Sequence, residues 1–487
     1  MEALLHRVVR VTVTVPRQKM APRAKTSAFM LGALVGGGAA VGAVSGVDCV
    51  NDVVVHAEQR TVSGDLCFAS AAEQQICMSE GQITAKQLTL AYLERIKSID
   101  SAGPRLCSVL EVNPEAVAIA EQLDIERQTT GARGPLHGIC VLLKDNVDTG
   151  DAMHTTAGSL ALLDSVPSSG DATITRKLRD AGAIILGKAN LSEWANYRGN
   201  SSSGWSGRGG QCKNPHVLDN TPGGSSSGSG SSIAAALAAM AIGSETDGSI
   251  VSPSNVNGIC GIKPTVGLVS RSGIVPISAD QDTAGPMCRS VTDCAAMLTV
   301  IAGADPAGDP SPPNCIPSSV PIDYVSEMLK PCSGGQSALA GLDGARIGVL
   351  RSKFSGTLKR QPVGCNGWSV RQGMQPTLSK EQSEALLEQK CLEPLRQAGA
   401  TLVDVNTHST RCTTPVECML FDLKFSFMGS AARQVELWSN GELEAVFPNG
   451  LDELRGHYKV TLGYQFVRDI AAYLSTRTTN ITDPAVG

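Results

Sequence analysis

Short apolar runs alternate with helical patterns through the middle of the chain. Apolar runs of about four to eight residues are typical of buried strands, whereas apolar residues spaced three or four positions apart indicate helices. Alternation of strands with helices predicts an α/β fold in which helices cover both faces of a sheet. The predicted strands are residues 139–143 and 183–187, and the predicted helices are residues 171–181 and 232–240.

The pattern continues on both sides of this central region. Residues 81–99 place apolar side chains on one helical face, and Thr84 is a candidate N-cap for that helix. Residues 303–338 are rich in Pro, Ser, Gly and Asp, which predicts an excursion on the surface. We therefore expect a single domain over residues 60–487. Its later part is predicted to contain strands at 345–350 and 400–405 around a helix near 380–397.

The first 47 residues differ from the rest of the chain. They carry six basic residues and one acidic residue, and no charge occurs between Lys25 and Asp48. A basic leader, a long uncharged run and the small residues at 43–45 predict a secretory signal peptide, and hence a secreted protein or one in the lumen of the secretory pathway. An uncleaved membrane anchor is the second interpretation, because the run is long enough to span a bilayer. A mitochondrial presequence would explain only the Arg-rich start.

Composition excludes several classes of protein. The 487 residues are 42% hydrophobic and 18% charged, so the chain can bury a sizeable core and is not disordered throughout. The net charge of −5 argues against a nucleic-acid partner. The seven His residues are scattered and form no zinc-binding spacing, so we expect neither a metal nor a cofactor. The fifteen Cys residues would allow disulfides in an oxidising compartment, although the sequence does not define their pairs.

Three segments contain candidate chemistry. In the segment of residues 135–146, PLHGICVLLKDN, Lys144 stands at the end of the predicted apolar strand 139–143. The Gly- and Ser-rich run at 221–232, TPGGSSSGSGSS, leads into an Ala-rich helix, where backbone amides point toward ligands. Residues 243–250, GSETDGSI, form a polar segment that contains Ser249. Taken singly, a solvated lysine, a flexible linker and a polar turn are the more common explanations.

Taken together, the three segments resemble the amidase signature family. That family has a lysine at the end of such a strand, a serine-rich run, and a nucleophilic serine 24 residues after the first serine of the run, which places Ser249 after Ser225. The stretches SSSGWSGRGGQ and SETDGSI are most similar to peptide-amidase-like members. The strong resemblance covers roughly residues 130–300. It implies the amidase signature fold, with a mixed, mostly parallel twisted central sheet.

The resemblance also implies a Ser–Ser–Lys triad. Ser249 would be the nucleophile, Ser225 the bridging serine after a cis peptide at Gly224, and Lys144 the general base. Lysine at its ordinary pKa of about 10.4 is protonated at neutral pH, but desolvation at the end of an apolar strand favours the neutral amine. A base of this kind is needed because a serine hydroxyl is a weak nucleophile. The implied oxyanion hole consists of the backbone N–H groups of Thr246, Asp247, Gly248 and Ser249.

Three positions depart from the usual family pattern without removing a triad member. Cys140 replaces a proline of the strand motif, and Ser227 replaces a glycine of the serine run. Asp247 stands where many members have glycine, although peptide-amidase-like members share the aspartate. Because Cys140 lies inside an apolar strand without a His at useful spacing, we expect a buried structural thiol and not a rival nucleophile.

The resemblance favours an amidase that hydrolyses a carboxylic or C-terminal peptide amide to acid and ammonia through an acyl-enzyme. The alternatives are the amidase component of an amidotransferase, which would need partner subunits, and a fatty-acid amide hydrolase. Membrane contact is expected only if the leader is an uncleaved anchor. A catalytically inactive binding protein is disfavoured because all three triad residues are present. Residues 464–474 resemble a late helix of the family, so we expect a shortened C-terminus or a fragment.

Overall fold

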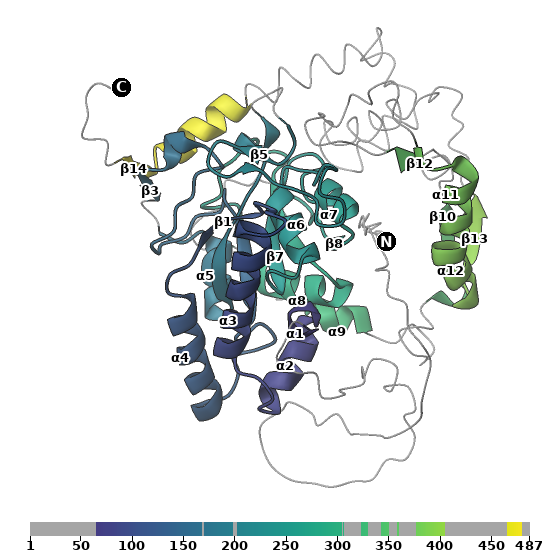
Figure 1. The fold of residues 1–487 in the computed structure, drawn as a ribbon, viewed down its shortest axis with the longest axis horizontal. Helices are drawn as coiled ribbons and strands as arrows, with labels where there is room; N and C mark the ends of the chain where they lie inside the picture. Colours follow the sequence, from purple (N-terminus) through teal and green to yellow (C-terminus); the bar gives the residue numbers. More distant parts are fainter. Residues whose placement is uncertain are drawn as a thin grey trace, which may run out of the picture.

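A six-stranded sheet forms the centre of the computed structural model (Figure 1). The structure describes residues 65–167, 170–197, 202–303, 305, 323–329, 342–349, 358–359, 376–404 and 465–479. The predicted leader and most of the predicted excursion at 303–338 lie outside these residues, so both stay predictions. In spatial order the strands are β1 (Val109–Val112), β4 (Ile184–Ala189), β2 (Cys140–Lys144), β7 (Met240–Glu245), β9 (Thr283–Cys288) and β8 (Cys260–Gly261).

The sheet is mixed, with its parallel pairs at the centre. Strand β2 pairs in parallel with β4 and with β7, whereas β1–β4, β7–β9 and β8–β9 are antiparallel. Parallel neighbours need a crossover connection. Helix α5 (Thr173–Asp180) lies between β2 and β4 in the chain, and α6 (Ser227–Ala234) lies between β4 and β7. The expected α/β fold with a mixed sheet is confirmed, but the expected mostly parallel pairing holds only for these central strands.

Helices pack along the sheet and bury its strands. Helix α6 contacts β2, β4, β7 and β9, while α5 packs against β4 and against α8, which contacts β8 and β9. All residues of β2, β4 and β9 are buried, as expected for near-continuous apolar strands under helices. The other α-helices among the described residues are α1 (Asp65–Phe68), α2 (Ala71–Ser79), α3 (Ala85–Arg95), α4 (Ala116–Thr129), α7 (Val251–Asn257), α8 (Val291–Ile301), α9 (Tyr324–Leu329), α11 (Lys380–Leu387) and α12 (Glu393–Gln397), together with a helix at residues 465–474.

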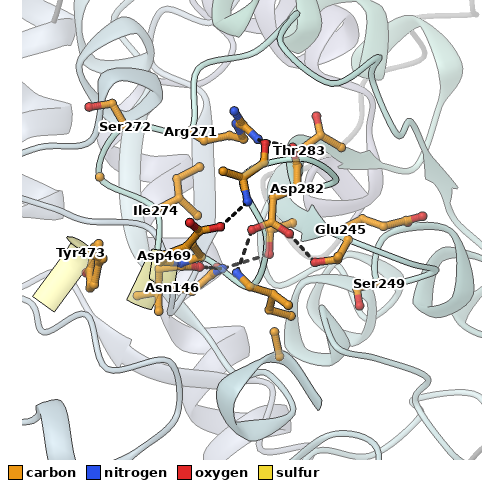
Figure 2. A pocket seen from close by; sticks show the side chains of 18 of the residues that line it. Asn146, Glu245, Ser249, Arg271, Ser272, Ile274, Asp282, Thr283, Asp469 and Tyr473 are labelled. Carbon is orange, nitrogen blue, oxygen red and sulfur yellow. Dashed lines mark hydrogen bonds between the residues drawn. The ribbon is translucent and has the colours of Figure 1, made fainter. Parts of the chain in front are cut away.

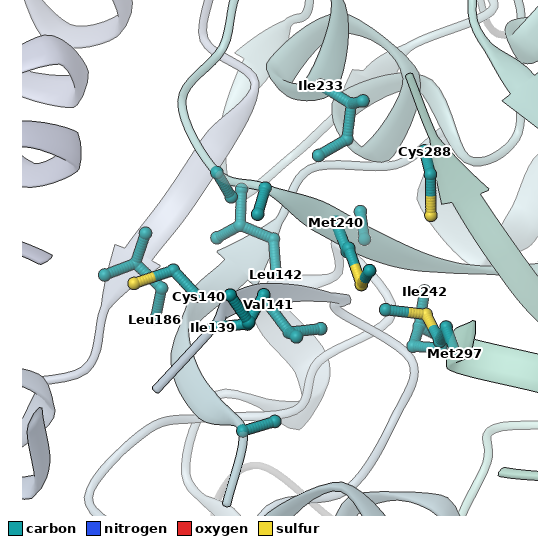
Figure 3. Close-up of a cluster of buried hydrophobic side chains, with 14 of the residues drawn as sticks. Ile139, Cys140, Val141, Leu142, Leu186, Ile233, Met240, Ile242, Cys288 and Met297 are labelled. Carbon is teal, nitrogen blue, oxygen red and sulfur yellow. The ribbon is translucent and has the colours of Figure 1, made fainter. Parts of the chain in front are cut away.

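The hydrophobic core lies between these helices and the central strands. Figure 3 shows side chains of β2 and β7 gathered with Ile233 of α6 and Met297 of α8. Cys140 belongs to this core. The predicted N-terminal helix is α3, which starts with a reciprocal cap: the Gln87 N–H donates to Thr84 Oγ1 over 3.1 Å and the Thr84 N–H donates to Gln87 Oε1 over 3.0 Å. The predicted N-cap is therefore confirmed.

The helix predicted at 232–240 is misplaced. Helix α6 begins at Ser227 inside the Gly- and Ser-rich run and ends at Ala234, and residues from Met240 onward form β7. Ala236 adopts a left-handed backbone with φ of 53°, which stops the helix before the apolar run is finished. Serine hydroxyls inside α6 bind backbone carbonyls, as in the 2.9 Å bond from Ser229 Oγ to Ile242 O. These bonds and close packing favour a serine-rich helix over the expected Ala-rich one.

Smaller sheets accompany the central one. The predicted strands near 345–350 and 400–405 are β10 (Arg346–Val349) and β13 (Thr401–Asp404), which pair in parallel next to α11 and α12. Near the C-terminal end of the described ranges, β14 (Arg477–Thr479) pairs with β3 (Ser165–Pro167). The other short strands are β5 (Trp205–Ser206), β6 (Gly210–Gln211), β11 (Leu358–Lys359) and β12 (Pro376–Leu378).

Two further observations concern the predicted environment of the chain. None of the helices among the described residues is long and apolar enough to cross a membrane. Six of the nine cysteines in the described ranges are buried, and no disulfide joins any two of the nine. The disulfides that an oxidising compartment would allow are therefore not formed among these nine.

Candidate active site

A cavity of about 350 Å³ lies beside the ends of β2 and β7 (Figure 2). Its wall includes Ser225 and Ser249, two members of the predicted triad. Lys144, the last residue of β2, is fully buried next to Ser225. The sheet thus brings together three residues that lie up to 105 positions apart in the sequence.

Lys144 has three hydrogen-bond partners. Its Nζ lies 2.8 Å from Ser225 Oγ, 2.9 Å from Ser244 Oγ and 3.1 Å from Ser244 O. Burial lowers the pKa of Lys144 to about 7, although the carboxylates of Asp282 and Glu245 oppose part of this shift. A lysine with this pKa is substantially neutral near physiological pH and can accept a proton.

The serine-rich segment is tied to the turn that contains Ser249. A cis peptide joins Gly224 to Ser225, as the family resemblance implied. The Ser225 carbonyl accepts a 3.0 Å hydrogen bond from the Ser192 N–H, and the Ser249 carbonyl accepts a 3.1 Å bond from the Ser226 N–H. These backbone bonds hold both serines at one end of the cavity.

Glu245 organises the turn between β7 and α7. Its carboxylate accepts hydrogen bonds from the N–H groups of Gly248, Ile250 and Val251 over 2.7–3.0 Å, and Lys263 Nζ lies 3.4 Å away. The turn brings the four predicted oxyanion-hole residues together. However, the Gly248 N–H points to Glu245, so in this arrangement it does not donate into the cavity as expected.

Two residues beside Lys144 were not predicted as part of the site. Asn146 Nδ2 donates a 2.9 Å hydrogen bond to Ser244 Oγ, the hydroxyl that also contacts Lys144. Asn146 follows Lys144 in the KDN motif, so the motif contained a signal for it. Ser244 opens the SETDGSI stretch, but it was not singled out because its strand was not predicted.

Asp145 and Asp282 fix the loops on either side of the cavity. Asp145 accepts bonds from Thr156 Oγ1 over 2.5 Å and from Arg208 Nη1 over 2.9 Å. Asp282 accepts a 2.5 Å bond from Thr246 Oγ1 and also bonds the amides of residues 277 and 278. Burial raises the pKa of both carboxyls, and their hydrogen bonds oppose that rise. These hydrogen bonds let both residues position the turns, and Asp282 also lines the cavity.

Cys140 is fully buried in β2, as expected for a structural thiol. Burial raises its pKa to about 12, and its Sγ lies 3.3 Å from Thr89 Oγ1. The thiolate that a nucleophile requires is therefore strongly disfavoured. Elsewhere in the described ranges, no group of three or more His, Cys, Asp or Glu residues is placed to hold a metal ion.

Residues 87–354 match the amidase family model. The chain belongs to the amidase family. Over 292 residues it is 45% identical to a protein of Arabidopsis thaliana named probable amidase, an alignment that covers 59% of this chain and 54% of the relative. It is also 38% identical over 285 residues to a glutamyl-tRNA(Gln) amidotransferase subunit of Halorhodospira halophila, covering 58% of this chain and 54% of that protein. The amidase chain thus spans about half the length of the curated relatives it matches.

Solved peptide amidases share the fold of this amidase. The native peptide amidase from Stenotrophomonas maltophilia is 41% identical with a TM-score of 0.60, and the match covers 86% of this chain and 77% of that one. The peptide amidase PAM in complex with the competitive inhibitor chymostatin is 44% identical with a TM-score of 0.58, covering 75% and 67% of the two chains. The predicted resemblance to peptide-amidase-like members is therefore confirmed.

Proposed function

We propose that this amidase hydrolyses a carboxylic amide or a C-terminal peptide amide to the acid and ammonia. The observation that carries the proposal is the 2.8 Å contact between the buried Lys144 Nζ and Ser225 Oγ, beside a cavity whose wall includes Ser249. A buried lysine with a pKa of about 7 supplies a base at neutral pH. Similarity to the solved peptide amidases supports a peptide amide as the substrate.

In the proposed reaction Ser249 Oγ attacks the amide carbonyl carbon. Its proton passes to Ser225, whose own proton passes to Lys144. Lys144 then returns a proton through Ser225 to the leaving nitrogen, the C–N bond breaks, and ammonia departs. Water attacks the resulting ester by the same proton route and releases the acid. Amides of the 246–249 turn stabilise the oxyanion, and Gly248 contributes once its N–H leaves Glu245.

Ammonia release from the purified 487-residue chain tests the proposal. The panel contains peptide amides, simple carboxylic amides, a fatty-acid amide and free glutamine. We expect release from peptide amides, and its loss in Ser249→Ala. The matched control is Ser252→Ala, which removes an exposed serine three residues away and should keep the wild-type rate. Equal rates in Ser249→Ala and the wild type would contradict the assignment of Ser249.

A component of an amidotransferase is the second candidate, because the chain is 38% identical over 285 residues to the amidotransferase protein of Halorhodospira halophila. That function predicts ammonia release from glutamine only after partner subunits are added. Release from peptide amides by the chain alone would reject it. Preferential release from the fatty-acid amide would instead favour a lipid amide hydrolase.

A further inference from the structure

The C-terminal described segment builds one wall of the cavity. Residues 465–474 form a helix, and Ala472, Tyr473 and Thr476 line the cavity from this segment. In Figure 2, Tyr473 and Ser249 lie at opposite ends of the labelled lining. A group that extends from Ser249 along the cavity therefore meets Tyr473. None of the predicted site residues comes from this part of the chain.

Tyr473 is fixed by a buried ion pair. Asp148 Oδ1 accepts hydrogen bonds from Tyr473 Oη over 2.8 Å and from Arg477 Nη1 over 2.9 Å. The side chains of Arg477 and Asp148 are 1% and 2% exposed. Arg477 Nη2 also donates to Thr155 O over 3.0 Å and to Ser165 O over 2.9 Å. With its hydroxyl held in this way, Tyr473 packs its ring against Val275 and Ala157.

The cavity offers apolar surface between these two ends. Ile274, Val275, Ile277 and Ala472 line it together with the Tyr473 ring. Its volume of about 350 Å³ lies at the lower end of the roughly 300–1,000 Å³ of small-molecule sites.

The charged groups in the wall already have partners. Glu245 binds backbone amides and Lys263, and Asp282 binds Thr246 and two amides. Asp469 accepts from the Ala279 N–H and from Arg468, while Arg271 donates to the carbonyl of Asp282. A charged substrate group would lose its hydration without gaining a free counter-charge. The lining therefore suits a neutral, apolar group.

We infer that Tyr473 and Ala472 determine the acyl specificity of the enzyme, and that the cavity takes an apolar side chain on the residue whose amide is hydrolysed. This inference rests on the proposed function. Within it, the C-terminal helix limits the length of the apolar side chain, and the Asp148–Arg477 pair keeps Tyr473 in place.

Two substrates and two neighbouring alanines test the inference. The substrates are N-acetyl-phenylalaninamide, with a large apolar side chain, and N-acetyl-glycinamide, with none. Ala472→Leu adds bulk at an exposed helix position that lines the cavity, so it should fold and narrow the subsite. We expect the ratio of kcat/KM for the phenylalanine amide over the glycine amide to fall about tenfold or more. Ala471→Leu is the matched control, because Ala471 is exposed on the same helix but does not line the cavity.

An unchanged ratio in Ala472→Leu and in Tyr473→Leu would overturn the inference, as would an equal fall in Ala471→Leu. Absence of turnover in the wild type would instead reject the proposed function. In that case the affinity for N-acetyl-phenylalaninamide, measured by calorimetry, still tests whether the cavity binds an apolar side chain next to Ala472. Weaker binding in Ala472→Leu than in Ala471→Leu supports it, and equal or undetectable binding in all variants rejects it.

Discussion

Lys144 Nζ has three acceptors within 3.1 Å, which matches the three N–H groups of a charged ammonium. A neutral amine has only two N–H groups and one lone pair. The Ser244 carbonyl can only accept, so after deprotonation one of the two hydroxyl contacts must reverse its direction. Donation from Ser225 to Nζ is the direction that the proposed proton transfer requires.

The pKa of Lys144 predicts the pH dependence of activity. Because its pKa is lowered to about 7, the neutral base is depleted below that pH and predominates above it. We expect kcat/KM for a peptide amide to rise as the pH increases through about 7 and then to level off. Ammonia release measured from about pH 5 to about pH 9 checks this. A rate that falls across this range would contradict Lys144 as the base.

Cys140 gives a prediction at the same scale. Since burial raises its pKa to about 12, iodoacetamide should not alkylate Cys140 in the folded protein at neutral pH. The exposed Cys391 is the internal positive control and should be labelled. Cys140→Ala should keep its rate within about threefold, because the thiol takes no part in the chemistry. Labelling is read by peptide mass spectrometry, and rapid loss of activity on alkylation of Cys140 would reject the structural role.

Sequence motifs identified the three residues of the predicted triad but not their hydrogen-bond partners. Lys144, Ser225 and Ser249 could be predicted because each lies in a short motif that resembles the family, and Ser249 follows Ser225 by 24 residues. The hydrogen bond from the Gly248 N–H to Glu245 could not be predicted, because it depends on how a short turn folds back on the end of its own strand. Ser244 was missed because strand β7 was not predicted and the polar segment that contains Ser244 was expected to form a turn.

At the scale of elements, α6 shows why the serine run is rich in glycine. A Cβ at Gly228 would lie 2.3 Å from Ser108 O and 2.4 Å from the Asn190 nitrogen. The helix therefore approaches two backbone segments more closely than any side chain allows. Composition alone favoured a linker for this run, whereas the structure uses its small residues for close packing against the sheet.

Gly228→Ala should destabilise the fold for this reason. Both neighbours are backbone atoms that cannot rotate away, so we expect a loss of at least about 1–3 kcal/mol in the free energy of unfolding. Gly134→Ala is the matched control, because nothing lies within 4 Å of its Cβ position. Urea unfolding of both variants gives the comparison, and equal midpoints would contradict the close approach of α6.

At the scale of the whole molecule, residues 477–479 contact residues that lie more than 300 positions earlier in the chain. Arg477 and Asp148 are 329 residues apart, and β14 pairs with β3 beside them. Figure 1 shows the C-terminal helix, in yellow, next to the end of the core where these two strands meet. Periodicity and spacing report only local structure, so the sequence indicated the helix near 464–474 but not its contact with the cavity.

Loss of the buried ion pair should therefore affect both stability and substrate binding. Arg477→Met leaves Asp148 buried without its cation, for which we expect a cost of about 3–5 kcal/mol. KM for N-acetyl-phenylalaninamide should rise in the same variant because Tyr473 loses its support. Arg468→Met removes a half-exposed charge from the helix that carries Tyr473 and should cost less than about 1 kcal/mol. Urea unfolding measures the loss of stability, and steady-state kinetics measures KM. Equal unfolding free energies and equal KM values in the two variants would contradict the role of the ion pair.

Asp148 lies four residues after Lys144, in the loop that follows β2. One short stretch of chain thus carries the proposed base and the anchor of the C-terminal wall. When amidases are recombined, the loop that contains Asp148 and the C-terminal segment that contains Arg477 therefore have to be exchanged together. Consider a chimera that receives residues 465–479 from a relative without an acid at the position of Asp148. It would gain that relative's cavity wall but not the ion pair that holds the wall in place. Grafting both together is the route by which selectivity could be exchanged while the base stays in place.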